Sequence, residues 1–305
     1  MKRLDRVGLT AAIGLAVYVV VFALVLERAD LPPMSVWTGI VLAGAALIQL
    51  GSVWFFGELF RSGLDGGVSP WSAFQAALVG STVARLLPAG GAVTPVAMAW
   101  TVREEAPGAG GAAIRATSLN YAALLVGTGL SLALISFLDP PAGWATWMRV
   151  AAAVAVVIGL GLMALTTRLG AVAHRLPEWL RSRLGQSMVD LPVDSRAQVL
   201  MWGRLGAEAL VLGIVLTAFG LPTAPVEVAA AFGLSQIAAG IPGTPGGVGF
   251  AEAGLVGALA VFGLGASVTL APILVFRLVS YWLPAGAGLL AGSRIFLAAR
   301  GTVSV

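Results

Sequence analysis

One stretch decides the fold of this chain: Gly240-Ile241-Pro242-Gly243-Thr244-Pro245-Gly246-Gly247-Val248-Gly249-Phe250-Ala251-Glu252-Ala253-Gly254, with two prolines and six glycines in an otherwise apolar region. Proline removes a backbone donor and glycine loosens the chain, so we expect broken backbone over residues 242–247. The apolar legs, Val226–Ile241 and Val248–Leu264, have 16 and 17 residues, whereas a hydrocarbon core needs about 20 helical residues. The pattern favours a re-entrant hairpin, because unpaired backbone survives at membrane depth only inside protein or beside water.

A second interpretation of this stretch stays open. A break rich in proline and glycine also occurs in an ordinary loop between two full spans. One acidic side chain, Glu252, lies one turn into the second leg. There it can neutralise an arginine, contact a cationic headgroup or carry a coupling proton, and the residue types alone do not choose among these roles.

The composition of the chain excludes a soluble domain. Hydrophobic residues make up 58% and charged residues 10% of the 305 residues, which is the composition of an integral membrane protein. Only short loops remain outside the apolar segments, so we expect a single transmembrane domain over residues 1–305. The net charge is +4, but the basic residues cluster on one predicted side, as membrane topology requires, and nucleic acid is not an expected partner.

The chemistry available to an enzyme is also limited. The chain has no cysteine and one histidine, His174, which excludes disulfides, thiol catalysis and thiolate metal sites. No histidine–acid pair, metal-ligand cluster or activated nucleophile is recognisable. The glycine-rich segments 108–111 and 159–161 lack the Walker pattern of a nucleotide site. We therefore expect no catalytic residues, no metal, no cofactor and no enzymatic activity.

Six apolar segments are long enough to cross a membrane as helices. They are residues 7–26, 35–57, 113–138, 144–167, 198–220 and 268–292. A second pair of short legs, Trp71–Leu87 and Ala92–Val102, flanks the break Pro88-Ala89-Gly90-Gly91 and predicts a second hairpin. The expected fold is therefore an all-α polytopic membrane protein with six full spans and two re-entrant helical hairpins. If the hairpins cross fully instead, the number of spans is ten.

The basic residues orient these segments. Lys2, Arg3 and Arg6 precede the first span, and arginines in the other inner loops fall on the same side, so both termini are expected in the cytoplasm. The longest polar stretch, residues 168–197, is the expected cytoplasmic loop, and its apolar residues recur at helical spacing. It is either an amphipathic helix on the inner leaflet or a solvated basic loop.

The order of segments repeats along the chain. Two spans, a hairpin and a span occupy residues 1–138, and the same order occupies residues 144–292. Three full spans separate the hairpins, so the second enters from the opposite membrane face and the halves are inverted repeats. This arrangement is typical of alternating-access transporters, whose sites lie at mid-membrane where broken helices of the two halves meet. Backbone amides exposed at the breaks can hold an anion there.

Two arginines, Arg85 and Arg277, lie within predicted membrane segments without an acidic residue one turn away. A charge at this depth costs at least about 2.5–3.5 kcal/mol on insertion scales. A guanidinium offers a planar fork of donors that suits phosphate oxygens, so the pair is a candidate clamp for a lipid headgroup. Alternatively, each arginine pairs with Glu252 or caps hairpin carbonyls. Arg204 and Glu208, four residues apart on one helix, are interpreted as a structural pair that neutralises itself.

Three patches carry a more specific signal than the composition. The run Pro245-Gly246-Gly247-Val248-Gly249 followed by Glu252-Ala253-Gly254 resembles a signature of the flippase-like membrane domain of lysylphosphatidylglycerol synthases. Arg277, Tyr281, Trp282 and Pro284 are similar to that family's closing helix, and Leu87-Pro88-Ala89-Gly90-Gly91 is similar to its first Pro-Gly break. Residues 92–95 are uncharged, whereas many relatives carry charges there. The resemblance covers nearly the whole chain and implies a stand-alone membrane domain without the soluble synthase domain.

The resemblance and the intramembrane charges together nominate a set of substrate-binding residues at the two breaks and in the last span. The set is Arg85, Pro88, Gly90, Gly91, Pro245, Gly246, Gly247, Glu252, Arg277 and Tyr281. Because Glu252 matches the acid of the family signature, the resemblance favours a ligand or proton-carrier role for this residue over a purely structural one.

We expect a lipid flippase or lipid transporter of the bacterial plasma membrane. It would move an anionic or aminoacylated phospholipid, or a polyprenyl-phosphate-linked lipid, between leaflets. Three alternatives are a secondary transporter of a small anion, which needs an aqueous vestibule, an intramembrane lipid-modifying enzyme, and a membrane partner of a separate synthase or glycosyltransferase. The lipid, the direction, the energy source and the oligomeric state, including a homo-oligomer, stay open at this point.

Overall fold

The computed structural model describes residues 36–64, 67–87, 90–168, 177–178, 193–221, 223–241 and 244–301. Every regular element within these ranges is a helix, which confirms the expected all-α class for the described part of the chain. Five helices in it are long and apolar enough to cross a membrane. They are α2 (Val36–Arg61), α5 (Gly110–Leu138), α6 (Ala145–Thr167), α9 (Ser195–Ala218) and the last helix over Ala266–Ser293.

These five helices coincide with five of the six expected spans, so the chain is a multi-pass membrane protein. The sixth expected span, residues 7–26, lies outside the described residues. The same holds for both chain ends and for most of the 168–197 loop, so the expected amphipathic helix there stays a prediction.

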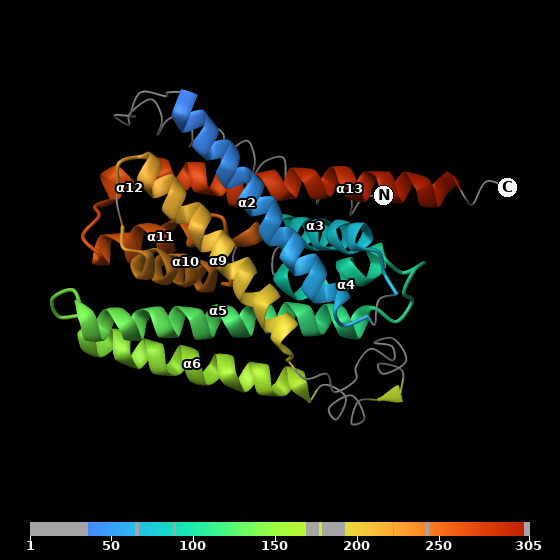
Figure 1. Cartoon of the computed structure of the whole chain (residues 1–305), viewed down its shortest axis with the longest axis horizontal. Coiled ribbons are helices and arrows are strands. Elements are labelled where there is room, and N and C mark those ends of the chain that lie inside the picture. The colour runs from blue at the N-terminus through green and yellow to red at the C-terminus, as the bar shows by residue number, and fades with distance from the viewer. Residues whose placement is uncertain are drawn as a thin grey trace.

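Two pairs of short helices occupy the segments expected as hairpins. The first pair is α3 (Pro70–Leu86) and α4 (Gly90–Thr101), and the second is α10 (Pro225–Ala239) and α11 (Phe250–Val261). Helices of 12 to 17 residues reach about 18–26 Å, less than the roughly 30 Å of a hydrocarbon core. The members of each pair pack against each other, and the pairs point toward one another from opposite ends of the molecule (Figure 1).

Local sequence explains where the hairpin helices begin and end. Helix α3 starts with Pro70, and the Ser69 hydroxyl accepts the backbone N–H of Ser72 at 3.0 Å, a standard N-cap. It ends at Leu86, and the C-cap residue Leu87 is extended, because the ring of Pro88 disfavours helical backbone at the preceding position. Each first leg thus begins with a proline, since Pro225 opens α10 in the same way.

The second break contains a short 3₁₀ turn, η1 (Pro245–Gly247), between α10 and α11. Gly246, Gly247 and Gly249 adopt positive φ angles of 56°, 68° and 89°, a left-handed region that side chains with a Cβ rarely adopt. The turn packs against α3 and α4, so the tips of the two hairpins meet. The prediction of broken backbone over residues 242–247 is confirmed at Gly246 and Gly247.

The last long helix contains a change of winding. It consists of α12 (Ala266–Arg277), a π-helical turn η2 (Leu278–Trp282) and α13 (Leu283–Gly301). A π-turn widens the helix and redirects backbone carbonyls, and such turns are frequent at functional sites. Here the π-turn lies beside both hairpin tips, because Tyr281 contacts Arg85 at the end of α3 and Pro245 in η1.

The long helices surround the hairpins. Helices α2 and α9 run side by side and pack together, while α5 and α13 run along opposite sides of the hairpins (Figure 1). Helix α6 packs along α5 through small residues: a Cβ added at Gly159 would lie 2.8 Å from the Ala122 carbonyl oxygen. Close backbone approach at glycine is a usual way for membrane helices to associate. The order long helix, hairpin, long helix occurs twice, as α2 to α5 and as α9 to α13.

Candidate functional site

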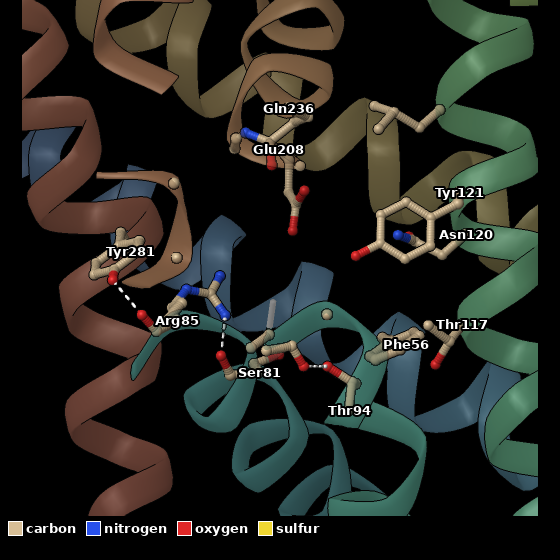
Figure 2. A pocket seen from close by; sticks show the side chains of 18 of the residues that line it. Phe56, Ser81, Arg85, Thr94, Thr117, Asn120, Tyr121, Glu208, Gln236 and Tyr281 are labelled. Atoms are coloured by element: carbon tan, nitrogen blue, oxygen red, sulfur yellow. Dashed lines mark hydrogen bonds between the residues drawn. The ribbon is translucent and has the colours of Figure 1, made fainter. Parts of the chain in front are cut away.

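A cavity of about 840 Å³ lies where the two hairpin tips meet. Its wall includes residues of both hairpins, of α2, α5 and α9, and of the π-turn in the last helix. The side chains of Arg85, Glu208 and Tyr121 point into the same space from three sides (Figure 2). The remaining polar side chains of the wall are Ser81, Thr94, Thr117, Ser118, Asn120, Arg204, Gln236, Thr244, Arg277, Ser280 and Tyr281.

Arg85 occupies the last turn of α3 and is held by backbone carbonyls. Its Nη1 donates to the carbonyl oxygen of Ser81 and its Nη2 to that of Ser280, each at 2.9 Å. The Ser280 carbonyl can accept because Pro284, four residues later, lacks the N–H that would bond to it in an α-helix. Among the described residues, no acidic side chain forms an ion pair with Arg85.

Tyr281 ties the tips of the two hairpins to the last helix. Its hydroxyl donates to the backbone carbonyl of Arg85 at 2.6 Å, and the carbonyl oxygen of Pro245 lies 3.4 Å away. Gly246 lies directly against this contact, because an added Cβ would be 2.5 Å from the Tyr281 hydroxyl and 2.6 Å from the Arg85 carbonyl oxygen. The junction therefore needs glycine at this position for space as well as for its positive φ.

Arg277 and Glu252 form a buried ion pair. The Nε of Arg277 donates to one Glu252 carboxylate oxygen at 2.7 Å, and the two side chains are 6% and 13% exposed. The other Glu252 oxygen accepts the backbone N–H of Gly249, also at 2.7 Å, and caps α11. The guanidinium stacks over the Tyr281 ring at 4.3 Å. Its Nη2 is buried and finds no hydrogen-bond acceptor among the described residues.

Arg204 and Glu208 also belong to this cavity. The two side chains face each other along α9, as their spacing predicts, with 3.6 Å between the Arg204 Nη2 and a Glu208 oxygen. The Ser52 hydroxyl donates to the same Glu208 oxygen at 3.3 Å, and the Arg204 guanidinium lies 3.9 Å from the centre of the Phe56 ring. The structural pairing is confirmed, but the position of both residues on the cavity wall was missed. The sequence signal that could have indicated this position was the presence of two nearby charges inside one apolar span.

The cavity has a mouth on the outer surface of the molecule. Four residues of its wall are exposed in the part of the chain that the structure describes: Ala92 in α4, Tyr121 in α5, and Gly240 and Ile241 after α10. Tyr121 is 41% and Ile241 49% exposed, and the Tyr121 hydroxyl points inward (Figure 2). The mouth is therefore apolar apart from one phenol, and it lies at the level of the hairpin tips.

The structure brings most of the nominated residues to one place. Seven of them line the cavity: Arg85, Gly90, Gly91, Gly246, Gly247, Arg277 and Tyr281. Pro245 and Glu252 do not line the cavity, but each contacts a residue that does. The carbonyl oxygen of Pro245 lies near the Tyr281 hydroxyl, and Glu252 binds Arg277. Pro88 lies outside the described residues. Within the described ranges, no group of three or more His, Cys, Asp or Glu side chains is arranged to hold a metal.

Comparison with known proteins places the chain in a family. No curated protein matches it. The sequence model described as the lysylphosphatidylglycerol synthase TM region matches residues 7–288. This range includes both hairpins and every residue nominated for the site. The match confirms the resemblance seen in the three sequence patches, and the chain belongs to the lysylphosphatidylglycerol synthase transmembrane-region family.

Proposed function

We propose that this protein is a lipid transporter that moves a lipid with a phosphate-bearing headgroup between the leaflets of the bacterial plasma membrane. The observation that carries the proposal is Arg85, which lies in a cavity between two broken helical hairpins without an acidic partner among the described residues. A guanidinium keeps its charge and presents several donors to phosphate oxygens. A phosphate group is therefore the natural counter-ion at this position.

The arrangement of the hairpins supports transport across the bilayer. In this proposal the long helices stand along the membrane normal, with six full spans, and the short pairs α3–α4 and α10–α11 re-enter from opposite faces. The repeated order of elements supports inverted repeats over residues 1–138 and 144–292. Sites of such transporters lie at mid-membrane between the repeats, and the contact between the two hairpin tips supports a site of this kind.

The apolar mouth favours a lipid over a small water-soluble anion. At the level of the hairpin tips, an opening bordered by Ala92 and Ile241 would face acyl chains, so a headgroup could enter with its chains left in the bilayer. A soluble anion would instead need an aqueous vestibule with a polar rim. We also propose that the protein performs no covalent chemistry of its own, with a separate lipid-modifying enzyme or glycosyltransferase as a further partner.

The proposed orientation places both chain ends and the 168–197 loop in the cytoplasm. The natural sequence has no cysteine, so a Ser182→Cys variant carries a unique thiol. We expect an impermeant maleimide to label this thiol in opened cells and to leave it unlabelled in intact cells. Labelling of position 182 from outside intact cells would contradict the proposed orientation.

Reconstitution tests the proposed transport. Purified protein in liposomes with fluorescent phosphatidylglycerol should expose inner-leaflet label to an added membrane-impermeant quencher. We expect Arg85→Gln to slow this exposure about tenfold or more, since a charge-assisted hydrogen bond contributes about 1.5–3 kcal/mol. Arg103→Gln is the matched control, because Arg103 lies just after α4, outside the cavity wall, and its side chain bonds only Trp100 and Glu104 among the described residues.

Two results would contradict the proposal. If the wild-type protein leaves the inner-leaflet label protected but carries a soluble anion such as phosphate into the vesicles, the cavity serves a small anion. If Arg85→Gln and Arg103→Gln both transport lipid at the wild-type rate, Arg85 does not hold the headgroup.

A further inference from the structure

We infer that the cavity selects a headgroup with one net negative charge, a single phosphodiester without a cationic group, and that Glu208 sets this limit. The inference rests on the proposed function for the nature of the ligand as a lipid. The charge balance of the wall is a separate observation and can be tested by binding alone.

Over the described residues, the charges around the cavity add up to one excess positive charge. The charged residues of the wall are Arg85, Arg204, Glu208 and Arg277. Arg204 pairs with Glu208 at 3.6 Å, and Arg277 pairs with Glu252 at 2.7 Å from behind the wall. Arg85 is left without an acidic partner among the described residues, and residues 7–26, the expected first span, contain no charged side chain.

An excess charge in a cavity walled by protein has to be compensated. Charges attract and repel more strongly there than in water, and an uncompensated buried charge is costly. One phosphodiester charge would leave the loaded cavity neutral. A diphosphate headgroup would leave it negative, while a zwitterionic or cationic headgroup, such as an aminoacylated one, would leave the loaded cavity positive.

The position of Glu208 makes it the residue that sets the balance. It is 9% exposed, and its carboxylate points into the same space as the Arg85 guanidinium (Figure 2). Its neighbour Ser52 is fully buried, and the Ser52 hydroxyl lies 3.3 Å from the carboxylate and 2.8 Å from the Gln49 carbonyl oxygen, so Glu208 contacts α2. Without Glu208, two of the three wall arginines would face the ligand uncompensated. With it, the cavity accepts one negative charge.

Two substitutions shift the balance in opposite directions with little change in shape. Glu208→Gln removes one negative charge, and the amide oxygen can still accept from Ser52, so the preference should move toward a doubly charged headgroup. Arg204→Gln removes one positive charge, so the preference for an anion over a zwitterion should disappear. Glu104→Gln is the control, because Glu104 is 80% exposed and lies outside the cavity wall.

The test measures binding by the purified protein in detergent. Three short-chain lipids are titrated: dihexanoyl phosphatidylglycerol with one negative charge, dihexanoyl phosphatidylethanolamine with none, and dihexanoylglycerol pyrophosphate with two or more. Affinities are read from the ligand-induced rise in melting temperature and from native mass spectrometry. We expect the wild-type protein and Glu104→Gln to bind phosphatidylglycerol about tenfold more tightly than the other two lipids, because each unmatched charge costs on that order.

The two variants then decide the role of Glu208. We expect Glu208→Gln to bind the pyrophosphate lipid about tenfold better than the wild-type protein does, and Arg204→Gln to bind phosphatidylglycerol and phosphatidylethanolamine equally. Equal binding of all three lipids by the wild-type protein overturns the inference, whichever variants fold. An unchanged ranking in Glu208→Gln overturns the role of Glu208. Selective binding without lipid transport in vesicles would instead refute only the proposed function.

Discussion

Gly246→Ala is expected to lower the free energy of unfolding by about 2–5 kcal/mol and to abolish lipid movement in vesicles. The residue has a φ of 56°, which costs a residue with a Cβ about 1–2 kcal/mol. The new methyl group would also lie 2.5 Å from the Tyr281 hydroxyl and 2.6 Å from the Arg85 carbonyl oxygen, and overpacking of this kind costs about 1–3 kcal/mol. Both effects weaken the contact that joins the hairpin tips to the last helix.

The melting temperature in detergent measures the first effect, and the vesicle assay measures the second. Gly257→Ala is the matched control, since Gly257 lies inside α11 with nothing within 4 Å of its added Cβ. We expect this control to be neutral or slightly stabilising, because alanine is the better helix former. A Gly246→Ala protein with the stability and transport rate of Gly257→Ala would show that the hairpin tips separate freely from Tyr281.

Glu252→Gln is expected to destabilise the protein by about 3–5 kcal/mol, because it leaves the Arg277 charge buried without its partner. The Arg277 side chain is 6% exposed, and its one carboxylate partner is Glu252 among the described residues. The substitution also weakens the cap of α11, whose N-terminal Gly249 N–H bonds to the second carboxylate oxygen at 2.7 Å. The measurement is the shift of the unfolding transition in detergent.

A second substitution separates a structural role of Glu252 from a role in transport. In Arg277→Met/Glu252→Gln no charge is left unpaired, so we expect the double variant to recover a large part of the stability lost by Glu252→Gln alone. The ligand or proton-carrier role favoured by the family resemblance predicts otherwise. Under that role, Glu252→Gln would be as stable as the wild-type protein, would still bind lipid and would fail only in transport.

The two predictions concern neighbouring parts of one junction. Gly246 lies against the hydroxyl end of Tyr281, and Arg277 stacks on the ring of the same tyrosine from within the last helix. Pro284 leaves the Ser280 carbonyl free for Arg85, so the spacing Arg277, Tyr281, Pro284 in the sequence becomes a surface that holds both hairpin tips.

The sequence by itself determined the class of the protein and the positions of its elements. Apolar length predicted the five described spans, and the proline and glycine of residues 240–254 predicted the broken backbone, because these properties depend on neighbours along the chain. It also identified Arg85 and Arg277 as charges that need a partner. The reason is that an arginine inside an apolar segment is costly in any fold.

Only the tertiary structure decided which partner each charge obtains. Arg277 meets Glu252, 25 residues away, whereas Arg85 meets the backbone of Ser280, 195 residues away, because the hairpin tips converge on the π-turn of the last helix. The i, i+4 spacing of Arg204 and Glu208 predicted their pairing and not the cavity that they face. Spacing along one helix specifies contacts within that helix, while a cavity is made by the packing of several helices, and no local pattern encodes it.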